Sequence, residues 1–83
     1  MRYTYNTAGV CSRLINIELA GDPVRSVRFE GGCNGNTKGI ASLVAGMNID
    51  EVIEKLEGIN CGFRGTSCPD QLAKALKEIK DNL

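Results

Sequence analysis

Apolar and polar residues alternate along the first thirty residues of the chain. Because side chains two positions apart lie on the same face of a strand, this alternation predicts strands with one buried face. The alternating apolar residues are Tyr3, Tyr5, Ile15, Ile17, Leu19, Val27 and Phe29. They fall in three short stretches, and the turn-forming residues 20–23 separate the second stretch from the third. We therefore expect three strands, of which the second and third pair as an antiparallel hairpin.

From Asn36 onward the apolar residues recur every three or four positions, which predicts helices. The first expected helix ends near Gly46. In the second, Asn48 and Glu51 have the spacing of a capping box, and Gly58 ends the helix. The expected inward residues are Ile40, Leu43 and Val44 in the first helix and Ile49, Val52, Ile53 and Leu56 in the second.

The sequence at 67–70 carries the signals for the start of a third helix. Ser67 or Cys68 can cap its first turn. Pro69 suits the first helical positions, and Asp70 brings a negative charge to the positive end of the helix dipole. The apolar stripe of this helix is Leu72, Leu76, Ile79 and Leu83. Since only one face of each strand is apolar, we expect a single α+β domain over residues 1–83, with a small antiparallel sheet of about three strands followed by three helices packed on one face.

The composition limits the class of protein. A chain of 83 residues buries only about two-thirds of its unfolded surface, so disulfides or a metal often stabilise such a domain. Lys plus Arg and Asp plus Glu number ten each, and this balance argues against a nucleic-acid-binding protein. The chain has no apolar run long enough to span a membrane and no secretory signal after Met1. We therefore expect a cytoplasmic protein whose thiols stay reduced.

The four cysteines, Cys11, Cys33, Cys61 and Cys68, fall at the ends of the expected elements rather than on their inward faces. Cys33 and Cys68 each precede a helix, where the helix dipole favours the thiolate form that binds metals. The chain has no histidine and no Cys-x-x-Cys pair, so a protein-only site would use four thiolates or include a carboxylate such as Asp70. Thiolates select zinc, an iron–sulfur cluster or copper(I). We expect one shared metal site, with scattered thiols and disulfides as the alternatives.

The segment 31–39 is rich in glycine and joins the third expected strand to the first helix. Gly35 and Lys38 are therefore candidate contacts for a nucleotide phosphate, although the spacing is not that of a Walker loop. A tight strand-to-helix turn explains the same glycines. The absence of histidine excludes a Ser-His catalytic pair, and we expect no catalytic residue.

The run Thr66-Ser67-Cys68-Pro69-Asp70 is the signature of the TSCPD domain family, and the chain resembles the stand-alone, four-cysteine form of that domain over nearly its whole length. The same domain occurs near the C-terminus of a subset of adenosylcobalamin-dependent (class II) ribonucleotide reductases. The resemblance implies an accessory or regulatory metal-binding module allied to deoxyribonucleotide synthesis, with a ribonucleotide reductase as partner. A nucleotide-binding component of ribonucleoside-diphosphate reductase is an alternative. The catalytic barrel and its radical-bearing cysteine have no counterpart here, so the isolated chain is not expected to be catalytic.

A more distant resemblance is to the U-type (NifU-like) iron–sulfur scaffold proteins. Cys11, Cys33 and Cys68 fall at the three cysteine positions of that family, and the resemblance implies a NifU-like fold. It also implies an alternative function as an iron–sulfur scaffold or carrier, with a sulfur or iron carrier protein as partner. The family's Asp after the first cysteine is replaced by Ser12-Arg13. The additional Cys61 can complete a set of four thiolates, and such a closed set favours structural zinc.

Overall fold

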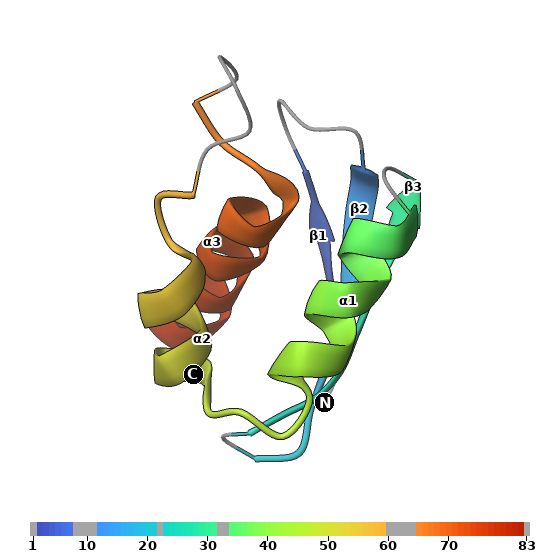
Figure 1. Ribbon diagram of the computed structural model, residues 1–83. Coiled ribbons are helices and arrows are strands. Elements are labelled where there is room, and N and C mark those ends of the chain that lie inside the picture. The colour runs from blue at the N-terminus through green and yellow to red at the C-terminus, as the bar shows by residue number, and fades with distance from the viewer. Residues whose placement is uncertain (1, 8–11, 22, 32–33, 60–64, 83) are drawn as a thin grey trace.

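Three strands are followed by three helices in the computed structural model, which describes residues 2–7, 12–21, 23–31, 34–59 and 65–82. The elements in chain order are β1 (Arg2–Asn6), β2 (Ser12–Leu19), β3 (Val24–Gly31), α1 (Asn34–Val44), α2 (Ile49–Leu56) and α3 (Cys68–Asp81). The three helices lie on one side of the sheet (Figure 1). The predicted α+β fold is therefore confirmed.

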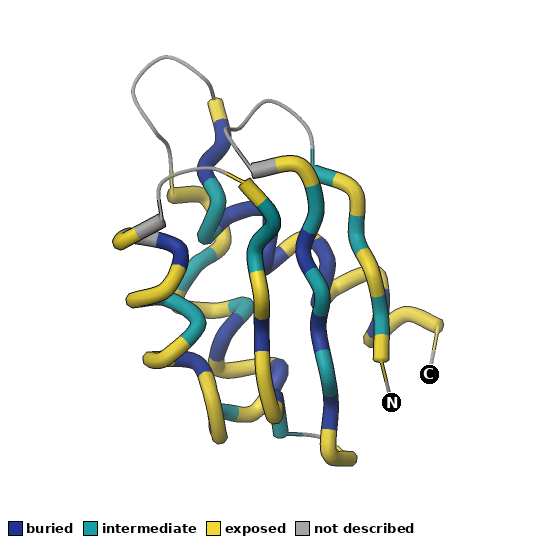
Figure 2. Tube along the Cα trace, turned by 90° about the vertical axis from the view of Figure 1, so that its right-hand side faces the viewer, coloured by how far each residue is buried: buried dark blue, intermediate teal, exposed yellow. Residues whose placement is uncertain are grey.

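The strands form an antiparallel sheet in the order β1-β2-β3, so β2 lies at its centre. The register pairs Tyr3 with Ile17 and Ile15 with Phe29, which places the alternating apolar side chains on the same face of the sheet. Ile15 and Ile17 on the central strand are buried, whereas Tyr3 and Phe29 on the edge strands are half-buried. Figure 2 shows this change of burial along and across the strands. The apolar face therefore lies toward the helices.

Backbone hydrogen bonds join the β2–β3 turn to the end of α1. In the turn, the Ala20 N–H donates to the Pro23 carbonyl at 3.0 Å. The next residue, Val24, donates to the Met47 carbonyl at 2.8 Å and accepts from the Gly46 N–H at 2.7 Å. Gly46 has a φ of 88°, a left-handed conformation that glycine adopts readily at the end of a helix. These bonds fix the position of the α1 C-terminus beside the start of β3.

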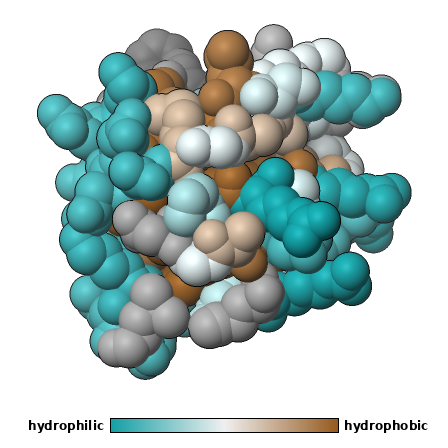
Figure 3. Space-filling model, turned by 90° about the horizontal axis from the view of Figure 1, so that it is seen from below, coloured by the Kyte–Doolittle hydropathy of each residue, from teal (hydrophilic) through white to brown (hydrophobic). Residues whose placement is uncertain are grey.

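One apolar core fills the space between the sheet and the helices. Its buried members are Ile15, Ile17, Leu19, Val24, Val27, Val44, Ile49, Val52, Leu72, Ala75, Leu76 and Ile79. Strands β2 and β3 contribute buried residues to this core, and Tyr3 and Tyr5 of β1 pack against its edge. Seen from below, apolar side chains gather in the middle of the face and hydrophilic ones lie around them (Figure 3).

The prediction that Leu43 faces inward is wrong, because this side chain is 76% exposed. The inward stripe of α1 instead contains Thr37, Ala41 and Val44, which are buried or half-buried. Leu43 lies two residues after Ala41 and is therefore turned about 200° around the helix from it. The inward position four residues before Ala41 is occupied by a polar residue, Thr37. The pattern of apolar residues therefore does not indicate the buried face of α1.

The capping box predicted for α2 does not form as expected. Asn48 is the N-cap residue, but its side chain makes no capping hydrogen bond. Its backbone instead forms an isolated antiparallel bridge with Pro23, so the position of Asn48 is set by the β2–β3 turn. Asp50 and Glu51 still place negative charge in the first turn of the helix, where the dipole favours it.

The longest helix is α3, with 14 residues. Its predicted apolar stripe is confirmed for Leu72, Leu76 and Ile79, which are buried, while Leu83 lies outside the described residues. Within the ranges given above, no helix combines the length and the apolar character needed to cross a membrane.

We expect Leu76→Ala to lower the free energy of unfolding by about 2–5 kcal/mol, because it removes a fully buried side chain from the core. The chemically matched change Leu43→Ala should alter it by less than about 0.5 kcal/mol, because Leu43 is exposed. Urea denaturation of the reduced protein measures both values. Equal losses in the two variants would mean that α1 buries Leu43 in solution.

Candidate functional site

The first turn of α3 is capped by Ser67. Its backbone is extended, with φ −153° and ψ 170°, and its Oγ accepts a hydrogen bond from the Asp70 N–H at 3.1 Å. The Ser67 carbonyl accepts from the Gln71 N–H at 2.8 Å, which begins the helical hydrogen-bond ladder. Pro69 lies in the first turn, where its missing N–H costs no helical hydrogen bond. Of the two caps that the sequence allowed, the structure uses Ser67, and Cys68 is the first, half-buried residue of the helix.

The Asp70 carboxylate lies inside the protein, with only 3% of the residue exposed. Its Oδ2 accepts a hydrogen bond from the Thr66 hydroxyl at 2.5 Å, and its Oδ1 accepts one from the Gly58 N–H at 2.8 Å. The Lys74 Nζ lies 3.2 Å from Oδ2. The Thr66 Oγ1 in turn accepts from the Gln71 side-chain amide at 3.0 Å. The buried charge is tolerated because donors and a cation surround it.

Two opposing effects act on the pKa of Asp70. Burial raises this pKa, because desolvation disfavours the charged carboxylate. The hydrogen bonds from Thr66 and the Gly58 N–H, together with the hydrogen bond and charge of Lys74, lower it. The lowering effects prevail, and the pKa of Asp70 lies below its ordinary value of 3.8. The carboxylate is therefore ionised at neutral pH and accepts hydrogen bonds through both oxygens.

The same residues hold the segment that joins α2 to α3. The Ser67 hydroxyl donates to the Ile59 carbonyl at 2.7 Å, while Asp70 binds the N–H of Gly58. We call the four buried polar residues at the start of α3 the anchor cluster: Thr66, Ser67, Asp70 and Gln71. Sequence reasoning assigned Ser67 to capping and Asp70 to the helix dipole or, as an alternative, to metal binding. It missed the anchor cluster because the two backbone partners lie eight and twelve residues away along the chain.

One of the four candidate metal ligands, Cys68, falls in the part of the chain that the structure describes. Cys11, Cys33 and Cys61 lie outside the described residues. Among the residues that are described, no three His, Cys, Asp or Glu side chains are grouped so that they could hold a metal ion. The shared site of four cysteines therefore stays a prediction.

The described segments next to these cysteines lie at the same end of the molecule. Ser12, at the start of β2, pairs with Gly31, at the end of β3. Helix α1 begins three residues later, at Asn34. Ile59 is hydrogen-bonded to Ser67 at the start of α3. The start of β2, the end of β3 and the starts of α1 and α3 all lie at the upper end of the molecule in Figure 1.

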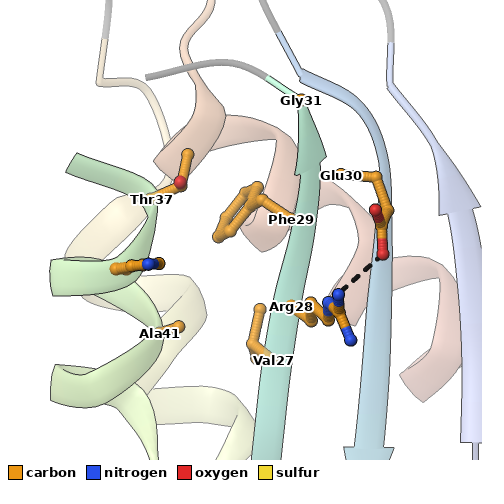
Figure 4. A pocket seen from close by; sticks show the side chains of 8 residues that line it. Val27, Arg28, Phe29, Glu30, Gly31, Thr37 and Ala41 are labelled. Carbon is orange, nitrogen blue, oxygen red and sulfur yellow. Dashed lines mark ion pairs between the residues drawn. The ribbon is translucent and has the colours of Figure 1, made fainter. Parts of the chain in front are cut away.

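A cavity of about 390 Å³ lies between β3 and α1. Val27 and Phe29 of β3 and Ala41 of α1 form its apolar lining. In Figure 4 the Val27 and Phe29 side chains extend toward α1. Arg28 and Glu30 also border the cavity, and they form an ion pair with an N–O distance of 3.3 Å. The cavity therefore has an apolar wall, and in Figure 4 the side chains of Arg28 and Glu30 extend from β3 on the side away from α1.

Lys38 is the candidate phosphate contact that borders this cavity. The residue is exposed and makes no ion pair with another residue that the structure describes. Gly35, the second candidate contact, is an exposed residue of α1 and is not among the residues that line the cavity. The structure thus brings Lys38, but not Gly35, to the space between β3 and α1.

Comparison with known proteins identifies one family. A family model described as the TSCPD domain matches residues 2–80. No curated protein and no solved structure matches the chain. The comparisons therefore agree with the first resemblance seen in the sequence and give no support to the distant resemblance to U-type scaffold proteins.

We expect Asp70→Asn to lower the free energy of unfolding by about 1–3 kcal/mol. The amide nitrogen cannot accept a hydrogen bond, so either Thr66 or the Gly58 N–H loses its acceptor, and the attraction to Lys74 is lost. Asp50→Asn is the matched control, because Asp50 pairs with Lys80 on the exposed surface, where an ion pair contributes at most about 1 kcal/mol. Chemical denaturation at neutral pH measures both.

The pH dependence of the free energy of unfolding distinguishes the contribution of the Asp70 charge from that of the side-chain shape. Because folding lowers the pKa of Asp70, the stabilisation is complete above the unfolded pKa and is lost as the pH falls through the folded pKa. Wild type should therefore lose stability below about pH 4, and Asp70→Asn should lose less over the same range. Identical acid profiles would show that other carboxyl groups control acid unfolding.

Proposed function

Because the chain belongs to the TSCPD domain family, we propose that it is a metal-binding domain in which Cys11, Cys33, Cys61 and Cys68 share one zinc ion or iron–sulfur cluster. The observation that carries this proposal is that the described segments next to all four cysteines lie at the same end of the molecule. These segments come from positions that are far apart in the sequence. Thiols that share no site would not require this placement.

Covalent connectivity strengthens this argument. Cys11 directly precedes Ser12, and consecutive Cα atoms are about 3.8 Å apart. Cys33 lies between Gly31, the partner of Ser12, and Asn34, where α1 begins. The chain therefore gives Cys11 and Cys33 short tethers to neighbouring positions on β2, β3 and α1.

The chemistry of the donor set favours zinc. Cys68 begins α3, where the positive end of the helix dipole stabilises a thiolate. Four thiolates satisfy the tetrahedral preference of a structural zinc ion and leave no open position. Bound zinc would contribute directly to folding stability, which suits a chain with a small core.

We further propose an accessory role beside a larger enzyme, with a ribonucleotide reductase as the expected partner. The family relation supports this role, as does the lack of a His-assisted nucleophile in the sequence. The cavity of about 390 Å³ between β3 and α1 and the pocket of about 510 Å³ lined by β1, β2 and β3 are both too small for a cobalamin-sized cofactor. On this proposal the isolated chain does not reduce ribonucleotides.

A second candidate function is binding of a nucleotide phosphate beside Lys38. The observation that favours it is the position of this exposed cation at the rim of a cavity with apolar walls. An aromatic ring, that of Phe29, lies in the same lining and could contact a base or sugar. Gly31, two residues before Cys33, also lines this cavity, so the two proposed sites would be neighbours in the domain.

We expect protein purified anaerobically to contain about one zinc ion per chain by elemental analysis. Iron with acid-labile sulfide in place of zinc would indicate a cluster. Cys33→Ser and Cys68→Ser should reduce metal retention more than Cys11→Ser, because thiolates at helix N-termini are the most readily ionised. Metal-free protein that is folded and as heat-stable as the purified form would count against the metal site. Full retention in Cys61→Ser would favour a three-cysteine, scaffold-like site.

If Lys38 contacts a phosphate, ATP or dATP should bind saturably and Lys38→Ala should abolish most of this binding. Lys55→Ala is the matched control, because Lys55 is an exposed lysine on α2 that does not line the cavity. Isothermal titration at low ionic strength measures the dissociation constants. Equal weakening by the two substitutions would indicate general charge attraction rather than a site.

A further inference from the structure

The hydrogen bonds of the anchor cluster close the chain between α2 and α3 into a loop. One closing bond joins the Ile59 carbonyl to the Ser67 hydroxyl, and the other joins the Gly58 N–H to the Asp70 carboxylate. Both side chains lie within two residues of Cys68, on either side of it. The bonds therefore hold the end of α2 against the first turn of α3.

This closure restrains the second cysteine of the segment as well. Cys61 follows Ile59 by two residues, so covalent geometry keeps their Cα atoms within about 7 Å of each other. Ile59 is bonded to the residue that directly precedes Cys68. If these bonds were absent, Cys61 and Cys68 would be linked only by the six residues between them, and bringing the thiols together would cost chain entropy.

Helix capping does not explain the whole arrangement. Capping requires the bond from the Asp70 N–H to the Ser67 Oγ and nothing from the Asp70 side chain. The carboxylate and the Thr66 hydroxyl are both buried, and they bond to each other at 2.5 Å while Asp70 also holds Gly58. A fully satisfied buried network of this kind makes the surrounding backbone rigid.

We propose that the anchor cluster is a positioning device for a pair of thiolates, setting the separation of Cys61 and Cys68 for a shared metal ion. Thr66, Asp70 and Gln71 do not contact the metal in this arrangement. They act through the loop, in the way that residues outside the ligand set orient metal ligands in other proteins. The proposal rests on the metal site proposed above, and it adds the reason why Thr66, Ser67 and Asp70 accompany Cys68.

The first test compares three single substitutions in the full chain. Thr66→Val keeps the shape of the side chain and removes the hydroxyl, whereas Thr66→Ser keeps the hydroxyl. Ile79→Val removes one methylene from the core near the other end of α3 and serves as the stability control. This substitution and the loss of one hydrogen bond each lower the free energy of unfolding by about 1 kcal/mol. Zinc dissociation constants are measured by competition with a chromophoric chelator on folded, reduced protein.

We expect Thr66→Val to weaken zinc binding about 10-fold to 100-fold, with Thr66→Ser and Ile79→Val within about threefold of wild type. A general loss of stability would affect Thr66→Val and Ile79→Val equally, and that result would overturn the proposal. Failure of the wild-type chain to bind zinc would defeat the proposed function, and the second test then decides on the anchor cluster by itself.

The second test needs no metal. In a Cys11→Ser/Cys33→Ser background, oxidised glutathione reacts with the two remaining thiols to give one intramolecular disulfide and two molecules of reduced glutathione. The equilibrium constant gives the effective concentration of Cys61 with respect to Cys68. We expect a fall of at least about threefold when Thr66→Val is added and no change when Thr66→Ser or Ile79→Val is added. Equal effective concentrations in the Thr66→Val and Ile79→Val variants would overturn the proposal. Equal effective concentrations of the unsubstituted two-cysteine protein in native buffer and in concentrated urea would also overturn it.

Discussion

The ionised carboxylate of Asp70 constrains the arrangement of α2, α3 and the segment between them. Burying an isolated charge costs several kcal/mol, so Asp70 can be buried only where its hydrogen-bond donors are present together. Those donors come from the residue before the helix cap, from the end of α2 and from the next turn of α3. A displacement of any of the three parts would remove one of the partners of the carboxylate. One charged group therefore couples three separate segments.

This coupling gives a physical reading of the five-residue family signature. The Thr66 hydroxyl donates a hydrogen bond to the Asp70 carboxylate, Ser67 caps the helix, and the carboxylate also accepts a hydrogen bond from the Gly58 N–H. Pro69 fits a position where no helical donor is needed. Cys68 is the remaining member, and the bonds that cap the helix and hold Gly58 come from Ser67 and Asp70. Four of the five residues of the signature thus have structural explanations in the described contacts.

The sequence pattern predicted the strands, the order of the elements and most of the core correctly, because these depend on local periodicity. It failed for Leu43 because Thr37, a polar residue, shares the inward stripe of α1. It could not predict the bond between Asp70 and Gly58, because a backbone N–H carries no side-chain signature and the partners are twelve residues apart. The run Ser67-Cys68-Pro69-Asp70 did predict a helix start capped by Ser67 or Cys68, and the structure uses Ser67, whose capping contact lies within one turn.

The order of the elements has a consequence for synthesis on the ribosome. The sheet is a simple meander, so its three strands can pair as soon as residues 2–31 have emerged. Its apolar face belongs to the same core as Leu72 and Leu76 of α3, the last helix to be made. The nascent sheet therefore exposes Ile15 and Ile17 to solvent until α3 follows. During that interval the growing chain presents apolar surface of the kind that chaperones bind.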